Sequence, residues 1–240
     1  LLEPFYYFSP QIEEEKMKHV DVDEVQVVPP KFTGVKNVIL SQKEGNLESI
    51  DDYLAKNIEY PKEDAKNFKQ GTEVVRFVVS PTGQLSDFNI INEISPQIND
   101  EVIRVLQTTN GMWVPGYNNG DPVAMEKEVS VAFKVTGNRF TKDFKTMASK
   151  HFSNGTEILF YQNNPKKALK FYDKGIMLLP NDESLLFMRG MARYEVGNKD
   201  GAYRDWDRIN ALGGSINYNE YHAKLNELKG YAELNRIFNE

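Results

Sequence analysis

The stretch Met112–Val135, MWVPGYNNGDPVAMEKEVSVAFKV, decides the fold of this chain. It opens with two turn sequences, Trp-Val-Pro-Gly and Asn-Asn-Gly-Asp-Pro, because proline and glycine supply the backbone angles that tight turns need. Beyond the turns, every second residue from Val129 to Val135 is apolar, and polar residues such as Ser130 and Lys134 alternate with them. This period of two, without proline or glycine, predicts a half-buried β-strand with one face toward water.

The residues before that strand predict a helix and a β-hairpin. Ser49 is a good N-cap for a helix, which must end before Tyr60 because Pro61 disfavours the helical conformation of the residue ahead of it. Gly71 opens a strand with apolar residues on both faces, as expected of a central strand. A turn at residues 81–83 leads to a return strand over residues 85–92.

A second helix is expected after the hairpin, capped by Asn99-Asp100 and carrying an apolar stripe that includes Val102 and Leu106. The order helix, strand, strand, helix, strand predicts an α+β fold, in which a small three-stranded antiparallel sheet is covered on one face by two helices.

An ordered set of motifs in this region closely resembles the TonB C-terminal domain family, over about residues 46–136. The motifs are Tyr60-Pro61, Gly71 before a Val-rich strand, Thr82-Gly83, the helix carrying Val102 to Leu106, Trp113-Val114-Pro115-Gly116, and Asn119-Gly120-Asp121-Pro122-Val123. The resemblance implies a non-catalytic domain in the periplasm of Gram-negative bacteria. Such domains grip an extended segment of an outer-membrane transporter and pass on the effect of the inner-membrane proton gradient. Family members usually carry a transmembrane helix and a Pro-rich spacer ahead of the domain, and these 240 residues contain neither.

The C-terminal part repeats itself with a period of 34 residues. The repeated pairs are Ala168 with Ala202, Tyr172 with Trp206, and Pro180 with Gly214. This is the period of the tetratricopeptide repeat (TPR), a helix–turn–helix unit. Helices are expected at about residues 143–163, 165–179, 182–197 and 199–212, followed by a last helix from about Asn217 that acts as a cap.

The TPR family implies that the first helix of each pair lines a concave surface that binds peptides. The residues that would line this groove are Tyr161, Phe187, Met191 and Tyr194. The alternative is that they belong to the core between repeats, and it is favoured because apolar residues at helical spacing usually pack.

The two resemblances predict three parts of the chain, and a change in the sign of the charge near residue 137 supports the second boundary. Residues 1–45 form an N-terminal arm, residues 46–137 the TonB-like domain, and residues 138–240 the TPR-like domain. The net charge is -6 overall, but residues 137–240 hold 13 acidic and 16 basic residues, a net of +3. The basic residues are spread over several helices, which argues against nucleic-acid binding. In the arm, the apolar Leu1–Phe8 segment is expected to lie on a neighbouring domain or to bind a partner, and residues 25–28 could form a short strand.

The chain lacks the residue clusters that catalysis or metal binding would need. It has no cysteine, and His19, His151 and His222 are too scattered for a metal-ligand spacing. Phosphate-binding loops and nucleophile elbows are absent. We therefore expect no enzyme activity, no metal site and no cofactor. No run of residues is apolar enough to cross a bilayer, so any signal peptide, lipid anchor or transmembrane helix is expected upstream.

The candidate site is the edge of the last strand, over about residues 127–135. A long regular edge strand is a template for strand addition by a partner's extended segment. The residues assigned to this edge are Lys127, Val129, Val131, Phe133 and Val135, and Tyr60 and Pro61 are secondary candidates. Two alternatives stay open: residues 25–28 or the repeat domain cover the edge, or the protein is an envelope scaffold that recognises its partners through the TPR groove.

Overall fold

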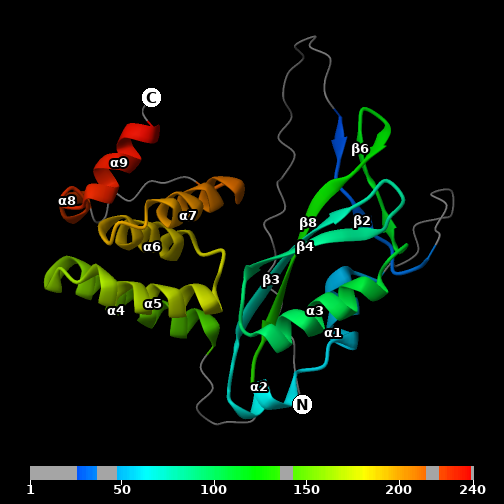
Figure 1. Ribbon diagram of the computed structural model, residues 1–240, viewed down its shortest axis with the longest axis horizontal. Helices are drawn as coiled ribbons and strands as arrows, with labels where there is room; N and C mark the ends of the chain where they lie inside the picture. Colours follow the sequence, from blue (N-terminus) through cyan, green and yellow to red (C-terminus); the bar gives the residue numbers. More distant parts are fainter. Residues whose placement is uncertain (1–25, 37–47, 136–142, 215–221, 239–240) are drawn as a thin grey trace. The chain divides into compact units, whose positions relative to one another are not determined.

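The computed structural model describes residues 26–36, 48–135, 143–214 and 222–238 (Figure 1). The chain separates into two compact units, Leu1–Asn138 and Arg139–Glu240. The predicted apolar segment Leu1–Phe8 lies outside the described residues.

The first unit is built on a three-stranded antiparallel sheet with the strand order β4-β3-β8. The strands are β3 (Gly71–Val79), β4 (Leu85–Asn92) and β8 (Met125–Phe133). The central position of β3 and the antiparallel pairing confirm the predicted sheet. The last strand begins at Met125, two residues before the predicted start.

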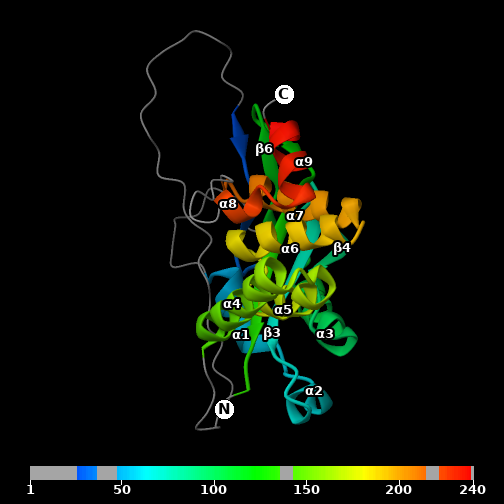
Figure 2. The same cartoon turned by 90° about the vertical axis from the view of Figure 1, so that its left-hand side faces the viewer.

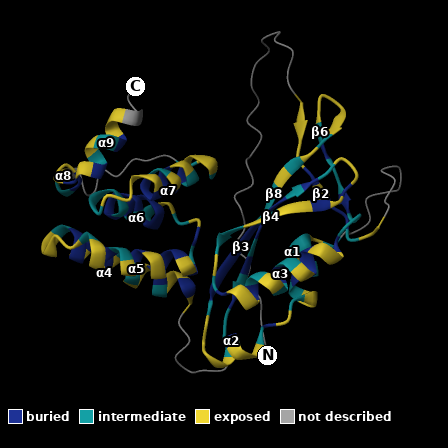
Figure 3. Cartoon of the chain, in the orientation of Figure 1, coloured by how far each residue is buried: buried dark blue, intermediate teal, exposed yellow. Residues whose placement is uncertain are grey.

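Helices α1 (Ile50–Asn57) and α3 (Pro96–Thr108) cover one face of this sheet. The core between them holds Val75, Phe77 and Val79 from β3, all fully buried (Figure 3). Ser49 caps α1 as predicted, and its hydroxyl accepts the N–H of Asp52.

The second helix starts earlier than predicted. Its N-cap is Ser95, whose hydroxyl accepts the N–H of Ile98, and Pro96 occupies the first helical position. The Asn99-Asp100 cap was therefore wrong. Proline at the first helical turn needs no N–H donor, so Ser-Pro is the stronger start signal here.

A short helix α2 (Lys62–Lys66) and four short strands were not predicted, whereas a fifth short strand, β1, falls within the strand expected at residues 25–28. β1 (Val27–Val28) pairs with β6 (Gly116–Asn118), which pairs with β7 (Asp121–Val123) through a two-residue turn at Asn119-Gly120. β2 (Lys31–Phe32) pairs with β5 (Trp113–Val114). The described part of the arm is thus tied to the turn region and not to β8.

The second unit is helical. The predicted helices are confirmed as α4 (Phe144–Gln162), α5 (Pro165–Leu178), α6 (Glu183–Glu195) and α7 (Lys199–Ala211). The predicted last helix is described as α8 (His222–Leu225) and α9 (Lys229–Phe238), with its expected beginning outside the described residues. Figure 2 shows the stack of paired helices, and α4 contacts α5 as α6 contacts α7.

The helices of both pairs pack together through the same kind of contact. A Cβ atom on Gly155 would lie 2.7 Å from the Tyr172 ring, and one on Gly190 would lie 2.2 Å from the Trp206 indole. The first helix of each pair thus places a glycine against the aromatic residue of the second helix.

None of the described helices is long and apolar enough to span a bilayer.

Candidate functional site

The strand β8 lies at one end of the central sheet. It pairs with β3 at nine consecutive positions, from Gly71 opposite Phe133 to Val79 opposite Met125, without a register shift. Within the described residues, β3 is its one strand neighbour. A long strand with regular pairing is a suitable template for another strand.

The opposite end of the sheet is a poorer template. The pairing of β4 with β3 shifts register between Val74 and Val75 and again between Arg76 and Val78. Asp87 in β4 has a φ of 53°, in the left-handed region. Bulges of this kind bend a strand and interrupt its outer row of hydrogen-bonding groups. The geometry therefore favours β8 over β4 for strand addition.

The side chains that were assigned to the β8 edge point mostly into the core. Val129, Val131 and Phe133 are only 4%, 9% and 4% exposed, and Lys127 and Val135 are partly buried. The three buried residues therefore position the strand, and only their backbone could meet an added strand. Val135 lies beyond the end of β8 at Phe133. Strand alternation places Glu126, Glu128, Ser130 and Ala132 on the opposite face. This second set was missed, although the period of two already predicts it.

That opposite face carries charge. Arg76 on β3 lies between two glutamates of β8, with N–O distances of 3.6 Å to Glu126 and 3.4 Å to Glu128. The side chain of Glu126 is 67% exposed. Such exposed ion pairs contribute little to the stability of a fold. Their charges can instead select the side chains that a neighbouring strand presents.

Tyr60 holds the end of β8 from within. It is 8% exposed, its ring packs edge-on against Phe133 at 5.3 Å, and its hydroxyl donates to the carbonyl of Lys69. Burial raises the pKa of Tyr60 to about 12, with a further contribution from Asp64. The assignment of Tyr60 as a surface contact is therefore corrected: it is a core residue. Pro61 is partly buried and is the N-cap of α2.

A buried carboxyl group lies behind the same part of β8. Glu73 is fully buried, directly opposite Val131, and its Oε2 accepts the N–H of Ile94 at 2.9 Å. Its Oε1 finds no hydrogen-bond partner within the described residues. Burial, reinforced by the charge of Glu93, raises the pKa of Glu73 to about 7.

The residues of the predicted TPR groove divide into two groups. Phe187 and Met191 are fully buried, which leaves them no surface for a partner and fits the core alternative. Tyr161 is 75% exposed and Tyr194 is partly buried. The end of the chain reaches three of the four residues, because a Cβ atom on Gly230 of α9 would lie 3.3 Å from Met191 and 3.0 Å from Tyr194.

The third of these contacts is between Tyr161 and α8. The Lys224 Nζ lies 5.8 Å from the centroid of the Tyr161 ring, within the range of a cation–π contact. The chain's own last helices therefore occupy part of the face that was predicted to receive a peptide.

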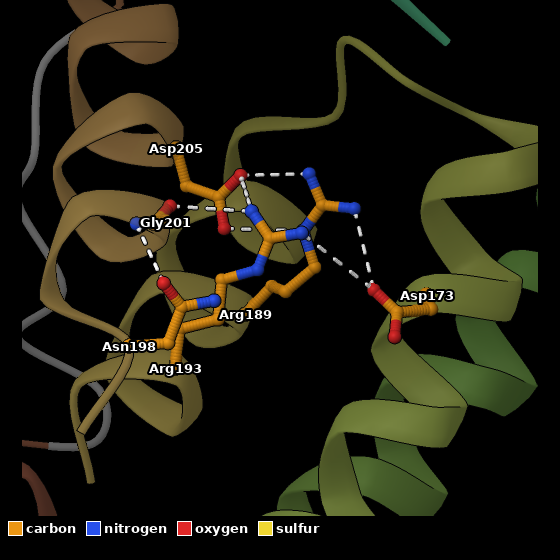
Figure 4. A network of polar contacts seen from close by, with 6 residues as sticks. All are labelled: Asp173, Arg189, Arg193, Asn198, Gly201 and Asp205. Carbon is orange, nitrogen blue, oxygen red and sulfur yellow. Dashed lines mark hydrogen bonds and ion pairs between the residues drawn. The ribbon is translucent and has the colours of Figure 1, made fainter. Parts of the chain in front are cut away.

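A network of hydrogen bonds and ion pairs connects the helices of the helical unit (Figure 4). Asp205 on α7 accepts hydrogen bonds from Arg189 and Arg193 of α6, each at 2.7 Å, and Arg189 also reaches Asp173 of α5 at 3.4 Å. Burial raises the pKa of Asp205, and the two guanidinium groups oppose this change. Among the described residues, no group of three His, Asp or Glu side chains could hold a metal ion.

Comparison with known proteins finds a family model that matches most of the sheet unit. The family model described as the Gram-negative bacterial TonB protein C-terminal matches residues 56–135. Residues 56–135 are therefore similar to a TonB C-terminal domain. The match spans the central sheet, α2, α3 and the turns between α3 and β8.

A likeness to a solved structure accompanies this match. The solution structure of the Helicobacter pylori TonB C-terminal domain is 14% identical, covering 36% of this chain and 89% of that chain, with a TM-score of 0.28. At that score the likeness carries no argument. No curated protein matches the chain. The assignment therefore depends on the family match to the TonB C-terminal domain, and it does not extend to the helical unit.

Proposed function

We propose that this protein is a non-catalytic, periplasmic protein-binding module of TonB type. Its TonB C-terminal domain engages an extended segment of an outer-membrane transporter, which adds as a strand beside β8. The observation that carries the proposal is the position of β8 at the end of the sheet order, with nine unbroken pairs to β3 behind it. The TonB family match supports the cell-envelope setting and this class of partner.

The energetics of strand addition fit this edge. Each backbone hydrogen bond gained contributes about 1 kcal/mol net, so a short segment needs several in register. A regularly paired strand whose core side chains are buried can form these hydrogen bonds without rearrangement. The exposed Glu126 then favours a partner with a basic side chain on that face, which would give selectivity.

A pair of proline variants tests the proposal, because successive N–H groups of a strand point to opposite edges. Ser130→Pro and Val131→Pro are compared by thermal unfolding, and the variant that stays folded has lost a donor on the outer edge. The probe is a blocked peptide, Thr-Val-Thr-Val-Thr-Val-Thr (the core peptide), titrated into isotope-labelled protein by NMR. We expect shifts centred on β8, and at least tenfold weaker binding in the folded variant. Unchanged binding would refute strand addition here.

For the helical unit, we propose a TPR-like module that makes a further protein contact. The 34-residue spacing, the matched glycine–aromatic closures and the exposed ring of Tyr161 support it. If Tyr161→Ala abolished partner capture in cells while the folded proline variant did not, the alternative function would hold. The protein would then be a scaffold in which the sheet domain is only structural.

A further inference from the structure

Phe68, between α2 and β3, combines two unfavourable features. Its φ is 53°, in the left-handed region, and its side chain is 63% exposed. Glycine or asparagine usually occupies that region, because a Cβ atom there crowds the backbone, and a bulky residue is an outlier. A buried ring could compensate for such strain by packing, but this ring is mostly in water.

The turn at Phe68 ends α2 through two backbone hydrogen bonds. The N–H of Phe68 donates to the carbonyl of Ala65 at 3.2 Å, and the N–H of Lys69 donates to the carbonyl of Asp64 at 3.0 Å. This is the left-handed helix ending that glycine normally provides. Nothing in the turn requires an aromatic side chain, so the fold does not explain Phe68.

The position of Phe68 relative to β8 supplies an explanation. Gly71, three residues further on, pairs with Phe133 at the end of β8. The carbonyl of Lys69 accepts the hydroxyl of Tyr60, whose ring packs on Phe133. Figure 1 shows α2 at the end of the sheet where β3 begins. Phe68 therefore lies three residues before the strand that pairs with the end of β8.

Three lysines are close to Phe68 in the sequence. Lys62 and Lys66 are exposed and four residues apart on α2, which places them on one face of the helix. Lys69 is also exposed, but its Nζ lies 2.9 Å from the buried Asp64 and is neutralised by it. The positive charge of Lys62 and Lys66 on this short helix suits an acidic group on a partner.

We propose that Phe68 is a contact residue for the partner segment that adds to β8, and that this segment carries an apolar side chain followed by an acidic one just beyond its paired residues. The inference rests on the proposed strand addition and deepens it. It gives a reason for retaining an exposed aromatic residue in a strained conformation, since backbone strain of this kind gathers at binding sites.

The test extends the core peptide toward Phe68. One peptide adds Leu-Glu at the C-terminus and another adds Glu-Leu at the N-terminus, because the orientation of the added strand decides which end lies beside Phe133. We expect one of the two to bind the full chain roughly tenfold more tightly than the core peptide, as burial of a leucine would give. Its titration should shift the Phe68 amide.

Variants then assign the gain to the ring and its lysine. Phe68→Gly and Phe68→Asn both suit a positive φ, so both should fold, bind the core peptide normally and lose the gain. Lys66→Glu should reduce the gain several-fold. Val35→Ser, at a residue with a similar exposure of 56%, is the matched control and should keep it.

Two outcomes would overturn the inference. If the core peptide binds at β8 but neither extension adds affinity, or if Phe68→Gly keeps the whole gain, strand addition stands and the role of Phe68 falls. If no peptide binds, both proposals fail together.

Discussion

Glu73 places a carboxyl group in the core with a pKa of about 7, above the usual 4.5. Between pH 4.5 and pH 7, Glu73 is therefore protonated in the folded state, whereas it has lost this proton in the unfolded state. The free energy of unfolding must fall as the pH rises from about 4.5 to 7, and the loss is complete above 7. Glu73→Gln keeps an acceptor for the Ile94 N–H and cannot ionise. We expect it to be more stable than the wild type at pH 8 by a few kcal/mol, and nearly equal at pH 4.5.

Urea unfolding at the two pH values measures this effect. Glu126→Gln is the control, because that side chain is 67% exposed and its removal should not change the pH dependence. An equal gain for Glu73→Gln at both pH values would contradict the shifted pKa.

Phe68 predicts a conflict between stability and binding. Replacing it with glycine removes the left-handed strain, and the exposed ring takes little packing with it. We expect Phe68→Gly to raise the free energy of unfolding by about 1 kcal/mol, measured by urea denaturation. A loss of stability would mean that the ring supports the fold. The exposed ring would then no longer be an argument for contact with a partner.

At the scale of elements, the N-terminal arm is predicted to contribute to the stability of the first unit. Phe32 is 7% exposed and its ring lies 5.3 Å from that of Trp113 and 5.6 Å from that of Tyr53. Phe32→Ala should therefore cost about 3 kcal/mol of stability. Val27→Ser, at a neighbouring residue that is 58% exposed, should cost almost none. Similar small losses for both variants in thermal unfolding would show that the arm is not part of the core.

The joint between α6 and α7 gives a second prediction at this scale. Asp205→Asn would leave the partly buried Arg189 and Arg193 without their shared carboxylate, at a cost of about 3 kcal/mol. Asp173→Asn removes a carboxylate that is 55% exposed, and it should cost less than about 1 kcal/mol. The difference in melting temperature between the two variants measures the effect, and equal losses would contradict the structural role of Asp205.

Periodicity predicted the longer elements because each is long enough to show its period. The four helices from α4 to α7 and the strands β3 and β4 fall within about two residues of their expected bounds. α2 and the short strands β2, β5, β6 and β7 were not predicted, because five residues or fewer show no period. The pairing of β1 and β2 with the turn region joins residues far apart in the chain, and no local pattern could reveal it.

At the scale of the whole molecule, the chain is predicted to contain two independently folding parts. The closures at Tyr172 and Trp206 and the buried Leu225 and Leu234 all lie within the second unit. A fragment spanning residues 139–240 should therefore stay helical and unfold cooperatively, as followed by circular dichroism. A fragment without a cooperative transition would show that its stability depends on the first unit.

The candidate site was only partly accessible from the sequence. Alternation identified β8 as a half-buried strand, and the sheet order now puts it at an end. The chosen side chains were those of the core face, because apolar residues produce the visible pattern. The opposite face and Phe68 carry no pattern. The signal at Phe68 is its φ, which only a structure supplies.

Hydrogen exchange along residues 129–133 tests the central claim most directly. In the free protein, the amides that face β3 should exchange slowly and the alternate amides quickly. With saturating core peptide, the fast amides should slow by more than about tenfold, since each gains a backbone partner. If all of them are already protected in the free protein, or if the fast amides stay fast with the peptide bound, the β8 edge does not receive a strand.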